Sequence, residues 1–400
     1  MGKWVKRKLG DLGFSFSGLS GKTIDDFGEG KPFIPYMNIF TNGKINSKQL
    51  EYVRIAENER QNKVEQGDWF FTTSSETPDE VGMTSVLVED IGEAYLNSFC
   101  FGFRLYDKSE FEPEFVSYLF RSLELRKKIS LFAQGSTRYN LPKQQMFNKL
   151  YISYPSSLSE QRRIASILSS ADKVIDSTQK LIAKYKQIKQ GMMEDLLKPK
   201  EGWKLVKLGE CLRQKPDYGI NAPAVEYDNN LPTYLRITDI TEDGYYSRND
   251  IVSVSSLDAL NYKLEDGDLV FARTGASVGK TYLYNQKDGI LVFAGFLIRV
   301  RTDEQIVLSQ FFLYQTQTPN YKNWIAANSM RTGQPGINGN EYGEFTFYIP
   351  YQNDIPDLPE QCRIASILSG IDKKIESEEK VLEKYKKIKK GLMERLLNCE

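Results

Sequence analysis

Histidine is the most informative absence, because none of the 400 residues is histidine. Its side chain is the usual general base near neutral pH and the commonest ligand of transition metals. The composition therefore disfavours the large classes of hydrolases and metalloenzymes that depend on an imidazole. An enzyme without histidine has few other ways to move a proton.

Cysteine and long apolar runs are also scarce. The four cysteines, Cys100, Cys211, Cys362 and Cys399, are scattered without paired spacing. This pattern argues against a zinc site or a disulfide framework and favours a reducing compartment. No apolar run approaches the ~18 residues of a membrane helix, and the opening MGKWVKRKLG lacks the apolar core of a signal peptide. We expect a cytoplasmic protein without a membrane partner.

Cofactor motifs are missing as well. Three residues separate Gly275 from Gly279 in a stretch that otherwise resembles a phosphate loop, whereas that loop needs four. Neither an Asn-Pro-Pro-Tyr motif nor a Phe-x-Gly-x-Gly loop, as in amino-methyltransferases, is present. A nuclease pattern could be formed only from Asp357 with Glu378 and Lys380, and the last two would fall on the solvated face of a helix, whereas such a cluster needs adjacent strand positions. We therefore expect no catalytic residue, metal or cofactor on this chain.

The chain has no excess of charge of either sign, with 53 basic and 53 acidic side chains. Their distribution is uneven, because residues 160–200 hold 9 basic and 5 acidic side chains, and residues 201–359 hold 14 and 20. A nucleic-acid contact would therefore depend on local patches, or on charge shared with a partner.

What the chain does have is a long repeat. Residues 160–197 and 360–397 are identical at about 24 of 38 aligned positions, and a repeat of this kind decides the architecture. The pattern Trp-x4-Leu-Gly opens both halves, at Trp4 and at Trp203. The chain is therefore a duplication, in which each half is a globular segment followed by the repeated segment.

The repeated segment has the periodicity of a helix with one broad apolar stripe. At ~1.5 Å per residue, each copy would be roughly 55 Å long. So long a stripe needs a long partner, and an antiparallel pair would relate the halves by a pseudo-twofold axis. The alternative is two unrelated core helices in separate domains.

The globular segments mix strands with short helices and lack regular βαβ alternation, which indicates an α+β fold. We expect a buried strand over Val292–Arg301, with Phe99–Tyr106 as its counterpart. We also expect a helix that starts at Pro113 and turns Phe115, Leu119 and Leu123 inward.

The two repeats share a signature with a known family. A Leu-x-Glu-Gln-x-Arg-Ile-Ala motif opens each long helix and follows a domain that begins Trp-x4-Leu-Gly, so the chain resembles the specificity subunit of type I restriction–modification enzymes. The second copy departs from the first in having Cys362 where the first has Arg162. The matching residues are Leu158, Glu160, Gln161, Arg163, Ile164 and Ala165, then Leu358, Glu360, Gln361, Arg363, Ile364 and Ala365.

The resemblance implies a non-catalytic subunit that recognises double-stranded DNA. It implies two target recognition domains, at residues 1–158 and 200–358, each reading one half of a bipartite site. Helices at 159–199 and 359–400 would form a coiled coil, set the spacer and dock two methyltransferase subunits. S-adenosylmethionine would bind those partners, and restriction or translocase subunits could join the complex.

Two sets of residues follow as candidates. Base reading needs polar side chains on loops, which favours Thr73, Ser74, Gln134, Ser136, Thr137, Arg138, Asn140, Arg273, Thr274, Ser329, Arg331, Thr332, Gln334 and Asn338. Helix pairing or partner contact would fall to Glu160, Gln161, Arg163, Ile164, Ile167, Leu168, Ile175, Ile182 and Tyr185, and to Glu360, Gln361, Arg363, Ile364, Ile367, Leu368, Ile375, Leu382 and Tyr385.

Other interpretations remain open at this point. The loops could be ordinary polar turns, and the chain could be a coiled-coil scaffold that binds only protein. A self-sufficient enzyme is disfavoured by the missing histidine and the missing cofactor motifs. The bases that would be read do not follow from the sequence.

Overall fold

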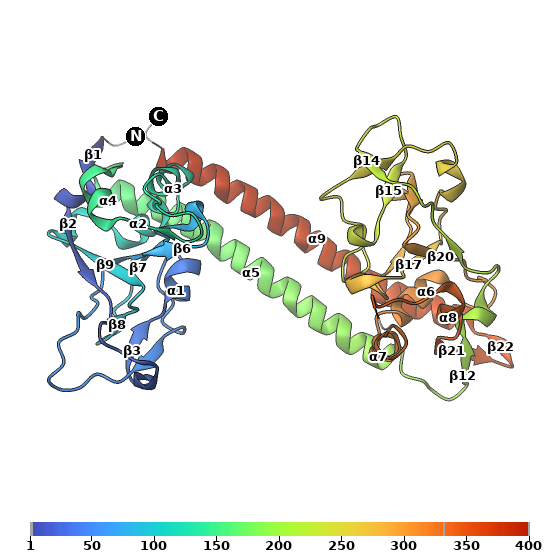
Figure 1. Ribbon diagram of the computed structural model, residues 1–400. Helices are drawn as coiled ribbons and strands as arrows, with labels where there is room; N and C mark the ends of the chain where they lie inside the picture. The colour runs from blue at the N-terminus through green and yellow to red at the C-terminus, as the bar shows by residue number, and fades with distance from the viewer. Residues whose placement is uncertain (1–2, 331–332, 399–400) are drawn as a thin grey trace. The chain divides into compact units, whose positions relative to one another are not determined.

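The computed structural model describes residues 3–330 and 333–398. The chain divides into two compact units. The first unit combines residues up to Gln179 with those from Lys380 onward, and the second spans Lys180–Glu379. Each unit therefore holds one globular domain together with a part of each long helix (Figure 1).

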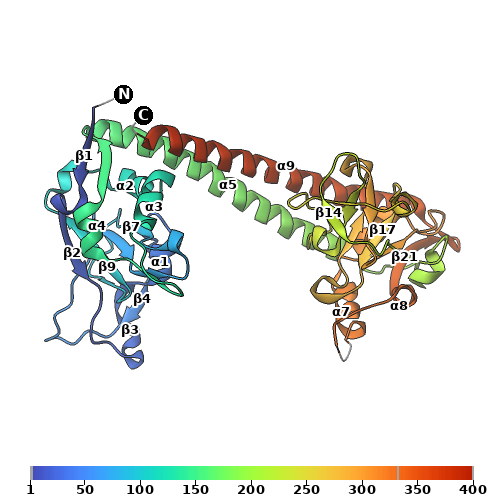
Figure 2. The same cartoon turned by 45° about the horizontal axis from the view of Figure 1, so that its top comes forward.

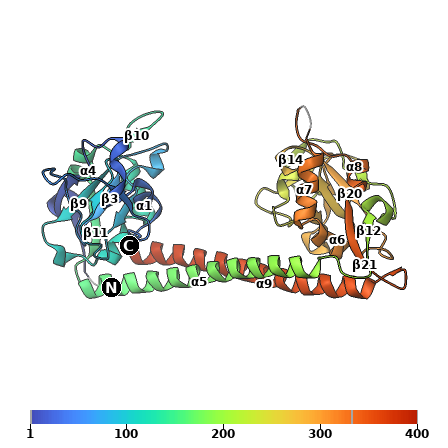
Figure 3. The same ribbon diagram turned by 90° about the horizontal axis from the view of Figure 1, so that it is seen from below.

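The two long helices are α5 (Leu158–Leu196) and α9 (Leu358–Leu397). In the first unit, Ile164 and Leu168 near the start of α5 share one core with Leu397 at the end of α9. In the second unit, Met193 near the end of α5 shares a core with Ile364 near the start of α9. The helices are therefore packed antiparallel in each unit (Figure 3), as the shared apolar stripe predicts.

The domain of the first unit is built around β5 (Trp69–Thr72), whose four residues are all buried. Trp69 and Phe71 point into one apolar cluster, and Phe70 between them points into another, as the two-residue period of a strand requires. The central antiparallel sheet has the order β2 (Gly13–Ser17), β9 (Cys100–Leu105), β5 and β7 (Thr84–Val86).

Smaller elements complete this domain (Figure 2). A second sheet has the order β4 (Glu51–Val53), β3 (Phe27–Ile34) and β8 (Tyr95–Leu96), while β1 (Trp4–Lys8) pairs with β11 (Tyr151–Pro155) and β6 (Ser74–Ser75) pairs with β10 (Tyr139–Asn140). The short helices are α1 (Tyr36–Thr41), α2 (Pro113–Leu119), α3 (Leu123–Ser130) and α4 (Lys143–Lys149).

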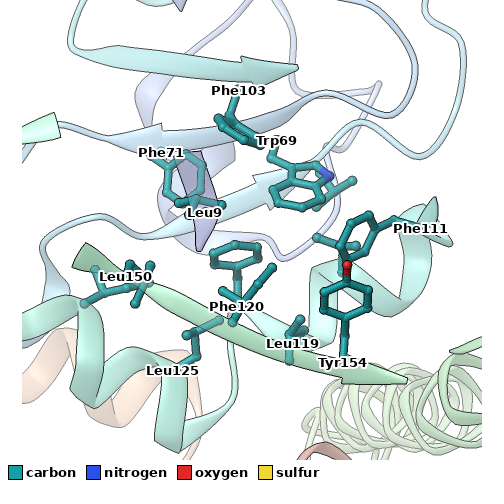
Figure 4. Packing of buried hydrophobic residues seen from close by; sticks show 14 of the residues in the cluster. Leu9, Trp69, Phe71, Phe103, Phe111, Leu119, Phe120, Leu125, Leu150 and Tyr154 are labelled. Atoms are coloured by element: carbon teal, nitrogen blue, oxygen red, sulfur yellow. The ribbon is translucent and has the colours of Figure 1, made fainter. Parts of the chain in front are cut away.

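An aromatic cluster fills the core beneath β5 (Figure 4). The ring of Trp69 has its centroid 5.3 Å from that of Phe103, 5.2 Å from that of Phe111 and 5.2 Å from that of Phe120. These rings come from two strands, a loop and the end of α2, so their contacts join local elements into one domain. Aromatic pairs of this kind add ~0.5–1.5 kcal/mol each beyond the burial of their surface.

The second unit repeats this plan around β17 (Leu269–Ala272), 200 residues after β5. Its central sheet has the order β13 (Asp217–Tyr218), β20 (Leu297–Val300), β17 and β18 (Thr281–Leu283). Another sheet has the order β14 (Ala224–Glu226), β16 (Val252–Val254), β15 (Thr233–Leu235) and β19 (Leu291–Phe293). A further sheet has the order β12 (Trp203–Lys207), β21 (Thr346–Gln352) and β22 (Ile355–Pro356). The helices are α6 (Ser309–Gln315), α7 (Pro319–Asn328) and α8 (Gly339–Gly343).

Two local predictions are wrong in part. The expected strand Val292–Arg301 is two strands, because the chain turns between β19 and β20, where the Leu297 amide donates to the Ala294 carbonyl at 2.8 Å. The helix from Pro113 ends at Leu119, and Leu123 is 53% exposed as the first residue of α3. Phe115 and Leu119 are buried as expected.

Two further features bear on function. No helix in the part of the chain that the structure describes is both long enough and apolar enough to span a membrane. Within residues 3–330 and 333–398, His, Cys, Asp and Glu side chains form no group that could hold a metal ion. Cys100 and Cys211 are buried free thiols, and burial raises the pKa of Cys211 to about 12.

Candidate nucleic-acid interface

Two polar loops that are far apart in the sequence lie side by side in the first unit. The β6 residues Ser74 and Ser75 pair with β10, and the Leu141 amide donates to the Thr73 carbonyl at 2.8 Å. The second loop closes on itself, since the Asn140 amide donates to the Gln134 carbonyl at 2.8 Å. Figure 3 shows β10 on the side of this domain away from the long helices.

The residues of these loops divide into two roles. The predicted candidates Thr73 and Ser74 support the backbone: the Thr73 hydroxyl donates to the Phe99 carbonyl at 2.7 Å, and Ser74 is only 6% exposed. The side chains free to meet a ligand belong to the second loop, where the exposed candidates are Gln134, Ser136, Thr137, Arg138 and Asn140.

The second unit brings its two loops together in the same way. The Ile337 amide donates to the Arg273 carbonyl at 2.9 Å, and the Gly275 amide donates to the Pro335 carbonyl at 2.9 Å. Gly275 has φ of +70°, a backbone conformation that favours glycine. Both domains therefore present a paired-loop surface.

The candidates on this second surface also differ in role. Ser329 is only 7% exposed, and its carbonyl accepts from the Gly336 amide, so it supports the loop. Gln334 is exposed, and Thr274 is half-buried. The side chain of Asn338 caps α8 by accepting from the Glu341 amide at 3.0 Å. Arg331 and Thr332 lie outside the described residues.

The stretch that resembles a phosphate loop, around Gly275 and Gly279, is a turn between two strands. The turn Gly275–Ser277 connects β17 to β18, which pair antiparallel as a hairpin. A phosphate loop instead leads from a strand into a helix, whose N-terminus completes the anion site. These glycines therefore shape a turn between strands.

Gln161 and Gln361, which the sequence groups with helix pairing, bind their own domains. Gln161 is fully buried; its Oε1 accepts from the Glu112 amide at 2.8 Å, and its Nε2 donates to the Glu110 and Pro155 carbonyls at 3.0 and 2.9 Å. Gln361 is equally buried, and bonds to the Ile306 carbonyl and the Leu308 amide. Each glutamine thus fixes the first turn of a long helix to the domain before it.

The neighbouring arginines Arg163 and Arg363 are exposed, and the glutamates beside them are half-buried. Arg163 pairs with Glu160 at 2.7 Å, and Arg363 pairs with Glu360 at 2.6 Å. Each arginine lowers the pKa of its glutamate through this hydrogen bond. Among the apolar candidates, Ile164, Leu168, Ile175, Ile182, Ile364, Leu368 and Ile375 are buried, whereas Ile167, Tyr185, Ile367, Leu382 and Tyr385 are half-buried.

A polar junction in the first unit joins both helices to the domain. Asp172 on α5 accepts from the Tyr118 hydroxyl of α2 at 2.7 Å and pairs with Lys389 of α9 at 2.5 Å. The Lys389 ammonium also lies 5.8 Å from the centroid of the Tyr118 ring. Burial, together with the hydrogen bond to Asp172, raises the pKa of Tyr118, so the hydroxyl stays protonated and can donate.

The second unit contains the same junction with the roles of the helices exchanged. Asp372 on α9 accepts from the Tyr314 hydroxyl of α6 at 2.8 Å and pairs with Lys189 of α5 at 2.7 Å. Lys189 also donates to the Gln317 side chain at 2.8 Å. These residues are not among the candidates predicted from the sequence, although Asp172 with Asp372, and Lys189 with Lys389, are identical pairs 200 positions apart.

Comparison with known proteins identifies the family. The profile described as "Type I restriction modification DNA specificity domain" matches residues 1–187 and 194–387. The chain belongs to this family. Its members are recognition subunits, so this specificity chain recognises DNA and leaves catalysis to partner subunits.

Curated relatives and solved structures agree with this assignment. The chain is 26% identical over 303 residues to the type I restriction enzyme MjaVIII specificity subunit of Methanocaldococcus jannaschii, covering 70% of this chain and 69% of that one. It is 29% identical over 163 residues to the putative MjaX specificity subunit of the same organism, covering 40% and 35%.

The solved structures support the fold alone, because their identity to this chain is low. The S subunit of a type I restriction–modification system from M. genitalium matches with a TM-score of 0.61 at 16% identity, covering 100% of this chain and 97% of that one. A chain from a structure on complex assembly and conformational transition of the type I system matches with a TM-score of 0.58 at 16% identity, covering 99% and 98%.

Proposed function

We propose that each globular domain of this specificity chain reads one half of a bipartite double-stranded DNA site. The first domain would comprise residues 1–158 and the second residues 200–358. The observation that carries the proposal is the convergence of two polar loops at corresponding places in both domains, through β6 and β10 in the first and through Arg273 and Ile337 in the second. Two similar surfaces with different side chains suit two different half-sites.

The long helices would connect the two readers and set the spacer between the half-sites. The Tyr–Asp–Lys junctions support this role, because each one ties a domain to both helices at once. The exposed, lysine-rich faces of the helices would dock two methyltransferase subunits, which would bind S-adenosylmethionine, and restriction subunits could join through them. A complex that acts on chromosomal DNA would work in the cytoplasm.

A scaffold that binds only protein is the weaker alternative, since the family is defined by DNA specificity. Sequencing the methylated bases of cells that express the chain with its methyltransferase partner tests the proposal. We expect a motif with two short defined segments, separated by a fixed number of undefined base pairs. A continuous motif, or a methylation pattern unchanged by the chain, would contradict it.

Exchange of one domain sharpens this test. Replacing residues 200–358 with residues of another member of the family should change one segment of the motif and leave the other segment unchanged. A matched chain with residues 1–158 replaced should do the reverse. If either exchange altered both segments, the assignment of one domain to one half-site would be wrong.

A further inference from the structure

The guanidinium of Arg273 has a hydrogen-bond donor that nothing in the described part of the chain satisfies. Its Nε is buried and has no hydrogen-bond partner. Among the described residues, the only other buried side-chain polar atom of this kind is the hydroxyl of Ser85. Folded proteins rarely leave a buried charged donor without an acceptor, because desolvation then goes uncompensated. Burial closes off Nε, so only the terminal nitrogens of Arg273 can meet a ligand.

The surroundings hold Arg273 in one orientation. Its guanidinium carbon lies 5.0 Å from the centroid of the Tyr218 ring, and the Tyr218 hydroxyl accepts from the Gly339 amide at 3.1 Å. The Arg273 amide donates to the Phe296 carbonyl at 3.1 Å, and its carbonyl accepts from Ile337. Stacking and backbone bonds together orient a planar group before any ligand arrives.

Arg273 also lacks an acidic partner, unlike four other arginines of the second unit. Arg236, Arg248, Arg299 and Arg301 each pair with an aspartate or a glutamate. No ion pair or hydrogen bond joins the Arg273 guanidinium to another described residue. Its terminal nitrogens are therefore available to an external acceptor at the junction of the two loops.

The geometry suits an acceptor pair. A guanidinium that is stacked, half-buried and held in one orientation can bond two acceptors in one plane at once, as a phosphate or a base edge offers them. In the major groove, the O6 and N7 atoms of guanine form such a pair, and arginine is their commonest partner. Two terminal nitrogens of one guanidinium can bond both atoms.

We infer that Arg273 is the specificity-determining residue of the second domain and that it reads a guanine in the second half-site. The inference rests on the proposed bipartite function and adds the identity of one base that the second domain reads. The corresponding residue of the first domain, 200 positions earlier, is Thr73, whose hydroxyl is already bonded to Phe99. The first half-site therefore has no equivalent determinant at this position, and the two halves differ.

The test uses the complex of the chain with its methyltransferase subunits. This complex is bound to DNA duplexes that carry the motif identified by sequencing methylated bases. Each guanine of the second half-site is replaced in turn by 7-deazaguanine, which keeps base pairing and removes N7. Binding of the unaltered complex should weaken at one of these guanines by about 5- to 150-fold. Because this arm needs no protein variant, it does not depend on the folding of one.

The second arm asks whether Arg273 is responsible. The Arg273→Ala complex should show no further weakening at that guanine, while its sensitivity to changes in the first half-site stays intact as an internal check of folding. Its methylated motif should also accept other bases at that position. The matched control is Arg213→Ala, since Arg213 is an exposed arginine of the same domain outside both loops. The Arg213→Ala complex should remain as sensitive to 7-deazaguanine at that guanine as the unaltered complex.

Three results would overturn the inference while leaving the bipartite function standing. The first is a second half-site without a G·C pair. The second is an Arg273→Ala complex that is as sensitive to 7-deazaguanine as the unaltered complex at every guanine. The third is a uniform loss of binding to all sequences, which would make Arg273 a phosphate contact. A motif without two separated halves would instead remove the proposed function itself.

Discussion

The Nζ of Lys189 lies 2.7 Å from a carboxylate oxygen of Asp372, and this pair joins α5 to α9 in the second unit. Lys389 and Asp172 make the same bond in the first unit. Asp172 and Lys189 are 17 positions apart in α5, as are Asp372 and Lys389 in α9. Equal spacing along both helices lets the two junctions form in one common register. An ion pair within an apolar seam is a known means of fixing register.

The two lysines should contribute unequally to stability. The side chain of Lys189 is 13% exposed and that of Lys389 is 29% exposed, so water weakens the second pair more. We expect Lys189→Met to lower the free energy of unfolding by ~1–3 kcal/mol and Lys389→Met by less. Urea unfolding measures both. Lys184→Met, at an exposed position of α5, is the control and should have no effect.

Gln161 should stabilise the connection between the first domain and α5. Gln161→Ala would leave the Glu110 and Pro155 carbonyls and the Glu112 amide without their partner, at a cost of ~2–4 kcal/mol. Limited proteolysis should then cleave between the first domain and α5, near Pro155. Gln179→Ala, at an exposed position of the same helix, should leave the cleavage pattern unchanged. An equally resistant Gln161→Ala protein would show that the hydrogen bonds do not hold this connection.

The glutamates that open the long helices give a pH dependence. The pKa values of Glu160 and Glu360 are lowered from 4.5 by Arg163 and Arg363. A carboxyl whose pKa is lower in the folded state stabilises that state when ionised, fully above pH ~4.5, and loses the contribution as pH falls through the lowered value. Because the arginines are exposed, water screens each pair and its contribution is small.

The measurement compares urea midpoints at pH 7 and pH 3.5. The unaltered chain should lose stability over this range, and the double variant Arg163→Met with Arg363→Met should be less stable at pH 7 but lose less on acidification. An identical pH dependence of the two proteins would show that other carboxyl groups dominate.

The sequence predicts the helices and the duplication well, because the helices follow from a short-range apolar period and the duplication from direct comparison of the two halves. The apolar period places α5 and α9 to within a few residues, and comparison of the two halves identifies the duplication. The division of Val292–Arg301 into two strands is not visible in this way, since each half pairs with a different, distant strand. Continuous apolar runs do not reveal which sheet each part joins.

The candidate site shows the same limit. Composition identifies the polar loops, but not that they meet in pairs, because the contact between Arg273 and Ile337 spans 64 positions. Nor does composition separate supporting residues such as Thr73 and Ser329 from exposed ones such as Arg138. The role of Gln161 is hidden too, since its partners are backbone atoms of another element.

A fragment of residues 1–200 should form a dimer. It keeps Asp172 and Lys189 but lacks Lys389, so a second copy can supply Lys189 to Asp172 and cover the apolar stripe in an isologous pair. With the methyltransferase it should direct methylation to a palindromic split site. Analytical ultracentrifugation measures the mass, and the fragment with Lys189→Glu should dimerise more weakly. A monomer at micromolar concentration would contradict the pairing of the stripes.

The central claim is that the paired helices hold two DNA readers at a fixed separation, and a matched insertion tests it most directly. Four residues added after Gln179 and four after Glu379 lengthen both helices by ~6 Å, equivalent to nearly two base pairs, while each junction keeps its partners. One turn leaves a residual rotation of ~40° for the pair to absorb. Sequencing of methylated bases should then give the same two half-sites, separated by one or two additional base pairs. An unchanged spacing would show that the helices do not set it, and altered half-site sequences would show that the readers are not the two globular domains.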